Sequence, residues 1–160
     1  MKKSRWIVYI VALTVVGFAG LELLAQASDP ANGAWELNLT KSKYASTPAP
    51  KSETRTIEVV GDRITFTARA MDADGKTTVS QFTANFDGKE YPLKGNPNYD
   101  SISLKRIDRF TTESTTLKAG KVVYRHRRVI SADGKVMTLT SQSTNAKGET
   151  LTDIQVYDKK

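Results

Sequence analysis

Six glycine-centred turn signals punctuate the chain, and they constrain its fold more than any other feature of the sequence. They recur at intervals of 13 or 14 residues, apart from one gap of 32. Three of them read Asp-Gly-Lys, and Asp-Gly favours a hairpin because Asp tolerates and Gly prefers the positive φ of primed turns. The six turns are centred on Gly61, Gly75, Gly88, Gly120, Gly134 and Gly148. This rhythm predicts a meander of antiparallel strands, with a further reversal near Asp108-Arg109 inside the long gap.

The segments between the turns alternate apolar and polar residues with a period of two, which is typical of half-buried strands. We expect strands at 34–39, 53–60, 63–71, 77–86, 89–93, 101–107, 110–118, 121–131, 136–144 and 150–158. Sequential hairpins without long crossovers favour a closed barrel over a sandwich, because a barrel leaves no open sheet edge. The sequence therefore predicts an all-β fold, an antiparallel up-and-down meander barrel of about 8–10 strands. Irregular loops are expected at 40–52 and 91–99, where prolines interrupt the pattern.

The first 27 residues differ from the rest of the chain. Three basic residues precede an apolar run that ends on the Ala-Gln-Ala of residues 25–27. This order predicts a secretory signal peptide, with a mature chain that begins near Ser28. An uncleaved anchor is the alternative, since the run of about 20 residues could just span a bilayer, but Glu22 and the Ala-x-Ala exit favour removal. We therefore expect a signal peptide at 1–27 and one β-barrel domain at 28–160.

Composition excludes several classes of function. The chain has no cysteine, which excludes disulfides, thiolate metal sites and a cysteine nucleophile. Its only histidine, His126, excludes a multi-histidine metal site within one chain, and the acidic residues are not clustered for oxygen-only ligation. The net charge of +7 is dispersed, and the one dense basic cluster, at 125–128, lies inside a predicted strand, which argues against nucleic-acid binding. Because nucleophile-elbow, phosphate-loop and dinucleotide motifs are absent, we expect no cofactor, no metal and no enzymatic activity.

Motifs at both ends of the predicted barrel resemble those of a known superfamily. Residues 33–37 read Gly-Ala-Trp-Glu-Leu, similar to the Gly-x-Trp opening of lipocalins and intracellular fatty-acid-binding proteins, which belong to the calycin superfamily. Residues 154–159 resemble the closing strand of the fatty-acid-binding branch, and residues 133–140 its penultimate hairpin. The chain also resembles secreted bacterial lipocalin-like proteins without established activity. The resemblance covers residues 28–160 and implies a barrel that holds a ligand in its interior.

The chain departs from that superfamily at three points. Fatty-acid-binding proteins cap the barrel with two helices after the first strand, whereas residues 40–52 are too short and too proline-rich for a helical pair. Their last strand carries an Arg-x-Tyr that binds a fatty-acid carboxylate, and the matching positions here are Gln155 and Tyr157, so only the tyrosine carries over. Lipocalins usually add a C-terminal helix, which has no counterpart after the last predicted strand.

Strand alternation places charged residues on faces that should point inward. Arg106 shares a face with Ile102 and Leu104. His126 and Arg128 share a face of the predicted strand 121–131 with apolar residues, among them Val122, Tyr124 and Ile130. A buried guanidinium without a partner is very costly, so inward arginines would need a buried acid, such as Asp153, or an anionic ligand. The alternative is that both arginines lie at the rim or outside, with their stems packed on apolar surface.

We therefore predict an exported lipocalin-like protein, bacterial and periplasmic or secreted, that binds a small amphipathic or weakly anionic molecule inside the barrel. The predicted ligand-binding residues are Arg106, Tyr124, His126, Arg128, Gln155, Tyr157, Phe66, Phe82 and Phe86. The expected partner is a small hydrophobic or amphipathic molecule, with no nucleic acid, no stable membrane span after signal cleavage and a monomeric state. One alternative is a ligand-free structural or interaction module of the bacterial envelope with a filled core, and another is a cofactor-free enzyme.

Overall fold

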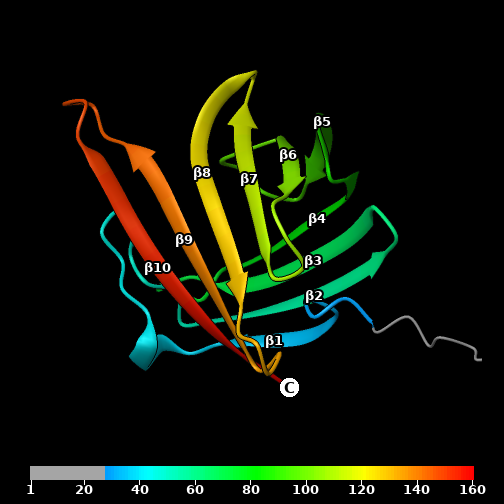
Figure 1. Ribbon diagram of the computed structural model, residues 1–160. Helices are drawn as coiled ribbons and strands as arrows, with labels where there is room; N and C mark the ends of the chain where they lie inside the picture. Colours follow the sequence, from blue (N-terminus) through cyan, green and yellow to red (C-terminus); the bar gives the residue numbers. More distant parts are fainter. Residues whose placement is uncertain (1–27) are drawn as a thin grey trace, which may run out of the picture.

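The computed structural model describes residues 28–160, which form a closed barrel of ten antiparallel strands (Figure 1). The strands are β1 (Gly33–Leu37), β2 (Ser52–Val60), β3 (Arg63–Met71), β4 (Thr77–Asn85), β5 (Asp87–Lys94), β6 (Ser101–Arg106), β7 (Thr111–Lys118), β8 (Lys121–Ile130), β9 (Val136–Thr144) and β10 (Thr150–Lys159). Each strand pairs with its neighbours in sequence, and β1 pairs with β10 to close the barrel. The predicted all-β meander barrel is confirmed, and every strand begins and ends within two residues of its predicted bounds.

The predicted turns form as their glycines require. All six turn glycines adopt positive φ, between 59° and 85°, a region that other L-residues rarely occupy. The reversal predicted near Asp108 is also present, because the Ile107 amide donates to the Thr111 carbonyl at 3.0 Å and the Asp108 carboxylate accepts from the Phe110 amide at 2.7 Å. These turns set the register of the hairpins.

The loop predicted at 91–99 is shorter than expected. Strand β5 continues through Pro92 to Lys94, so the loop spans only residues 95–100. Pro92 is tolerated because β4 pairs with β5 only at Leu93 and Lys94, so no β4 residue needs the missing proline N–H. The loop after β1 matches its prediction more closely, with one short 3-10 turn (Leu39–Lys41) and irregular chain up to β2.

One end of the barrel is packed and closed. Trp35, Ile64, Met137 and Tyr157 are the largest fully buried side chains, and the strand registers place them near the turns of this end. The segment 29–32 crosses the same end, where the carbonyl of Ala31 accepts the Trp35 indole N–H at 2.9 Å. A buried tryptophan with its N–H satisfied contributes a large apolar area to the core.

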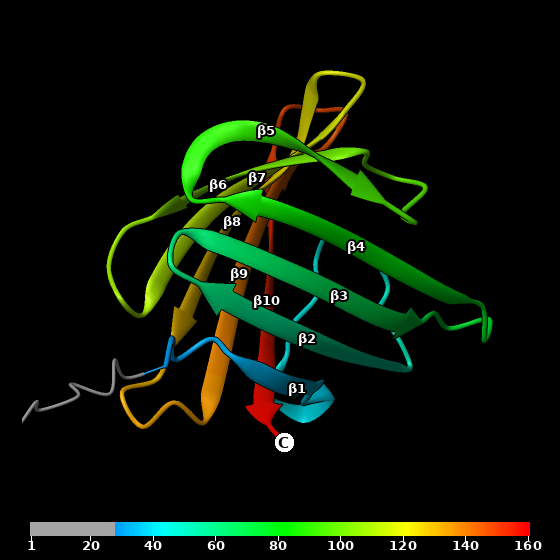
Figure 2. The same ribbon diagram turned by 90° about the vertical axis from the view of Figure 1, so that its right-hand side faces the viewer.

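The other end of the barrel is open to solvent and lined by longer connections. Residues 42–51, the β3–β4 turn at 72–76 and the 95–100 loop all lie there. Figure 2 shows β2, β3 and β4 side by side, with the β3–β4 turn and the loop after β5 projecting from the same side. The barrel therefore has one sealed end and one accessible end.

Candidate ligand cavity

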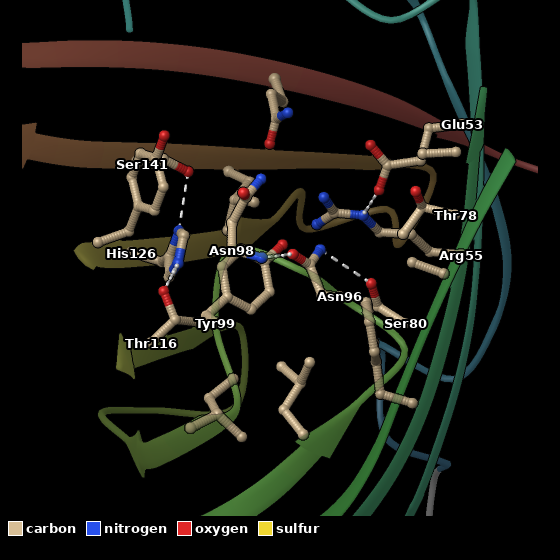
Figure 3. Close-up of a pocket in the computed structure, with 18 of the residues that line it drawn as sticks. Glu53, Arg55, Thr78, Ser80, Asn96, Asn98, Tyr99, Thr116, His126 and Ser141 are labelled. Atoms are coloured by element: carbon tan, nitrogen blue, oxygen red, sulfur yellow. Dashed lines mark hydrogen bonds and ion pairs between the residues drawn. The ribbon is translucent and has the colours of Figure 1, made fainter. Parts of the chain in front are cut away.

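The barrel encloses a cavity of about 430 Å³ that reaches the open end. This volume falls within the range of about 300–1,000 Å³ that is typical of small-molecule sites. Residues from each of the connections at 42–51, 72–76 and 95–100 line its mouth, among them Pro48, Lys76 and Tyr99. In the close-up of Figure 3, Arg55 and His126 enter the cavity from different strands, with Asn98 and Tyr99 between them.

Strand β8 presents Tyr124, His126 and Arg128 to the cavity, as alternation predicted. Val122 does not share this face and is 46% exposed. The β7–β8 register shifts between Thr116 and Leu117, so the strand bulges just after Val122 and turns that side chain outward. The inward face of β8 is therefore more polar than the sequence indicates.

His126 forms a hydrogen-bonded link across three strands. Its Nδ1 lies 2.8 Å from the Ser141 hydroxyl of β9, and its Nε2 lies 3.3 Å from the Thr116 hydroxyl of β7 (Figure 3). Burial, and to a smaller extent the positive charge of Arg55, lowers the pKa of His126 to about 4. The ring is therefore neutral at physiological pH, and hydroxyls can either donate to or accept from it.

Arg128 is a partly buried cation that forms no ion pair with an acid within residues 28–160. Its Nη2 donates to the Thr112 hydroxyl at 3.0 Å, and its buried Nε has no hydrogen-bond partner. Burial lowers the pKa of Arg128 to about 10, a shift that the charge of Asp29 opposes and that of Arg106 reinforces. The guanidinium thus remains charged at neutral pH without a carboxylate in contact, an arrangement that is costly unless a ligand compensates it.

Arg106 also points inward, but it lies at the closed end and does not line the cavity. Its Nη1 forms an ion pair with Asp29 at 2.5 Å, and its guanidinium stacks over the Phe86 ring at 4.2 Å. The acid that compensates it is therefore Asp29, from the segment before β1. Asp153 instead accepts the amides of Ala45 and Ser46 and holds the 42–51 loop against β10.

Sequence reasoning missed the most prominent ion pair of the cavity. Arg55 and Glu53, two residues apart on β2, both point inward, and the Arg55 Nε donates to the Glu53 carboxylate at 2.6 Å. Burial alone would lower the pKa of Arg55, but the charge of Glu53, its hydrogen bond to Arg55 and the neighbouring Tyr157 and Tyr99 together outweigh burial and hold the pKa above its ordinary value. The guanidinium also lies over the Tyr157 ring at 4.2 Å. The signal was present, because Arg55 alternates in phase with the buried Ile57 and Val59.

The structure brings six of the nine predicted residues to the cavity: Phe66, Phe82, Tyr124, His126, Arg128 and Gln155. The rings of Phe66 and Phe82 stack with their centroids 4.8 Å apart. The remaining three, Arg106, Phe86 and Tyr157, lie off the cavity. Tyr157 is fully buried, and its hydroxyl has no partner in the described part of the chain. Its ring packs against the Arg55 guanidinium and so supports the cavity wall from behind.

The 95–100 loop adds residues to the mouth that no sequence pattern indicated. The Asn96 side chain donates to the Ser80 hydroxyl at 3.1 Å and ties the loop to β4. Gly95 permits this close approach, because a Cβ there would lie 1.9 Å from the Val79 carbonyl oxygen. Burial raises the pKa of the Tyr99 hydroxyl, which keeps that side chain neutral and able to donate a hydrogen bond.

Residues 28–160 contain no group of three or more His, Cys, Asp or Glu side chains placed to hold a metal ion. Over the same residues, no helix has the length and apolar character needed to cross a membrane. The predicted signal peptide lies outside the described residues.

No protein-family model and no curated protein sequence matches this chain. Among solved structures, the zebrafish ileal bile acid-binding protein in complex with cholic acid is similar, with a TM-score of 0.55 and 16% identity over 82% of this chain and 99% of that one. The siderocalin Ex-FABP gives a TM-score of 0.40 and 11% identity over 82% of this chain and 71% of that one. The barrel therefore shares the fold of the zebrafish protein, in agreement with the antiparallel meander barrel that the turns and strand alternation predicted.

Proposed function

We propose that this protein binds a small anionic, amphipathic molecule inside its barrel. The observation that carries the proposal is Arg128, a partly buried cation in the cavity wall whose buried Nε has no partner and which has no carboxylate in contact among the described residues. A ligand anion in the cavity would supply the missing countercharge to the guanidinium. Such charge-assisted hydrogen bonds are shorter and stronger than neutral ones.

The apolar lining supports the same proposal. Phe66, Phe82 and Leu93 offer hydrocarbon and aromatic surface in the cavity that holds Arg128. Cavities that bind small molecules combine such surface with a few placed polar groups. The zebrafish protein with the same fold is described as bile acid-binding and was crystallised with cholic acid, which agrees with an amphipathic acid as ligand at the level of the fold.

Exchange of Arg128 for methionine tests this function. The Arg128→Met variant should bind a fluorescent fatty-acid analogue more weakly by about 1.5–3 kcal/mol for each charged hydrogen bond lost. The neutral methyl ester of that analogue should lose much less affinity. The matched control is Arg127→Met, since Arg127 is the outward neighbour on β8 and pairs with Glu113.

Three outcomes decide the proposal. A selective loss of the anionic probe in Arg128→Met, with Arg127→Met unchanged, supports it. Equal binding of the anionic probe by the wild-type protein and Arg128→Met would overturn the role of Arg128. Failure of the wild-type protein to bind either probe would favour the ligand-free envelope module.

Export remains part of the proposal and rests on the sequence of residues 1–27. We propose that the signal peptide is removed and that the mature protein resides in the periplasm or outside the cell. N-terminal sequencing of protein recovered from these fractions should find a chain that begins near Ser28. A chain that still begins at Met1 would overturn cleavage and favour an anchor.

A further inference from the structure

His126 is a titratable side chain of the cavity wall to which the proposed function gives no role. It lies on β8 between Tyr124 and Arg128, which also line the cavity, and its ring stacks on that of Tyr124 with the centroids 5.6 Å apart. Strand register places it in one row with Ser141 of β9 and Asp153 of β10. Histidine is the only side chain whose ordinary pKa lies close to neutral pH, and this chain has one. His126 is therefore the group whose protonation can respond to an anion in the cavity at ordinary pH.

The hydrogen bonds of His126 tolerate a change of protonation state. Its two partners are the hydroxyls of Ser141, 2.8 Å from Nδ1, and of Thr116, 3.3 Å from Nε2 (Figure 3). A neutral imidazole donates from one nitrogen and accepts at the other, whereas the imidazolium donates from both. Each hydroxyl can either donate or accept, so the ring can gain a proton when one hydroxyl rotates, and no hydrogen bond is lost.

The cations of the cavity oppose protonation of the ring in the protein alone. Arg55 enters the cavity from β2, and its positive charge disfavours the imidazolium in addition to the larger effect of burial. The carboxylate of Glu53 is already bonded to the Arg55 Nε at 2.6 Å. On β8 itself, Arg128 adds a second positive charge without a carboxylate in contact. A proton on His126 would thus add a further positive charge to a wall that already carries two.

The other groups around His126 do not offset these cations. Asp153, the acid in its row, accepts the amides of Ala45 and Ser46 at 2.6 and 2.8 Å. The lining residues of β7 and β9 have only hydroxyl or apolar side chains. The remaining charged lining residues lie at the mouth, in the turn at 72–76. Three phenols line the cavity and carry no charge near neutral pH: Tyr44, Tyr99 and Tyr124.

An anion inside the cavity changes this balance. Its negative charge offsets the charges of Arg55 and Arg128 and attracts the imidazolium, and an opposite charge within about 4–6 Å favours the charged form of a titratable group. Charges in a partly buried cavity are screened less than charges at the surface. Binding of the anion and protonation of the ring then strengthen each other by the same factor, because coupling between two bound species is reciprocal.

We propose that anion binding in this cavity is linked to the uptake of a proton by His126, so that the protein holds its ligand more tightly in mild acid than at neutral pH. This inference rests on the proposed function, because it concerns the regulation of the same site. The pKa of the ring is about 4 in the protein alone, and a bound anion raises it. Between these two values the complex binds more protons than the free protein, so the affinity rises as the pH falls through that interval.

Isothermal titration with an anion of permanent charge measures this linkage. The probe is the alkyl sulfonate counterpart of the fluorescent fatty-acid analogue, because a sulfonate does not titrate in this range. Its affinity should be roughly twofold to tenfold higher at about pH 5 than at about pH 7.5, with uptake of roughly 0.4–0.8 proton per bound probe at the lower pH. The proton uptake is obtained from the difference in heat between buffers of different ionisation enthalpy. The neutral methyl ester should bind equally at both pH values.

Two matched exchanges for glutamine isolate the histidine. His126→Gln removes the titratable ring, so its affinity for the sulfonate should not change over this pH interval. Glu113→Gln removes a titratable carboxylate from the outer face of β7, where it pairs with Arg127, and should retain the full pH dependence. In an NMR titration, the midpoint of the His126 ring should rise when the sulfonate saturates the wild-type protein.

The outcomes separate this inference from the proposed function. Equal sulfonate affinity at both pH values, the same proton uptake in His126→Gln, or an unchanged ring midpoint in the saturated protein would each overturn the proton linkage and leave anion binding intact. If the fatty-acid analogue binds but the sulfonate does not, the ring midpoint in the complex with that analogue decides in the same way. Failure of both anions to bind would overturn the linkage and the proposed function together.

Discussion

His126 gives a sharp test of the cavity electrostatics, because it is the only histidine of the chain and its titration can be isolated. Its pKa is lowered to about 4 by burial and by the charge of Arg55, whereas a histidine in the unfolded chain titrates near 6.5. Between these values the unfolded state binds more protons than the folded state. The free energy of unfolding contributed by this group therefore falls as the pH falls from 6.5 towards 4 and is fully present above that window.

The magnitude follows from the two pKa values. Acidification from about pH 7.5 to about pH 5 should lower the free energy of unfolding by roughly 2 kcal/mol through this residue alone. The assay is urea denaturation at closely spaced pH values, for the wild-type protein and for His126→Gln. Glutamine keeps a hydrogen-bonding side chain but does not titrate, so the difference between the two curves isolates the histidine.

Two results would refute this reasoning. One is a difference between wild-type and His126→Gln stability that does not change over that pH interval. The other is an NMR titration of the His126 ring with a midpoint near the unperturbed value. Either would mean that the cavity is much more hydrated around β8 than the burial of the ring indicates.

Three further predictions concern the ends of the barrel. Asp29→Ala should lower the free energy of unfolding, measured by urea denaturation, by about 2–4 kcal/mol, because it leaves Arg106 partly buried without its acid. The double variant Asp29→Ala/Arg106→Met should lose less unfolding free energy than the two single variants lose in sum. Gly95→Ala should lower the melting temperature by several degrees, since its Cβ would overlap the Val79 carbonyl, and no change would contradict the close approach. Asp153→Ala should speed amide hydrogen exchange in the 42–51 loop more than in the strands, because this carboxylate accepts two loop amides.

The strands could be predicted because local rules act alone there. Asp-Gly turns and period-two alternation determine where a hairpin reverses and which face is buried, and neither needs long-range information. The prediction was inaccurate where an interaction between strands decides the outcome. Val122 is exposed because of a bulge in the β7–β8 register, and strand β5 tolerates Pro92 because its pairing with β4 is short.

The cavity was less predictable than the fold, for an electrostatic reason. The alternation of β2 places Glu53 and Arg55 in phase with the buried Ile57, but this signal is easily overlooked because charged residues usually lie on the outside of a barrel. They are accommodated because they neutralise each other within one strand and face an accessible cavity. The partner of Arg106 was unpredictable from strand patterns, since Asp29 precedes the first strand. Tyr99 reaches the cavity from a loop without periodicity.

The pairing of β1 with β10 also controls when the barrel can form. Trp35 aligns with Lys159, so the last ladder joins segments more than a hundred residues apart in sequence. Closing so long a loop is entropically costly and slow, and no shorter piece of the chain can complete the ladder. Until β10 has been synthesised, β1 has no partner on that side and the barrel cannot close. Such delayed closure is compatible with the proposed export, because a barrel that has not closed can still cross a membrane as an extended chain.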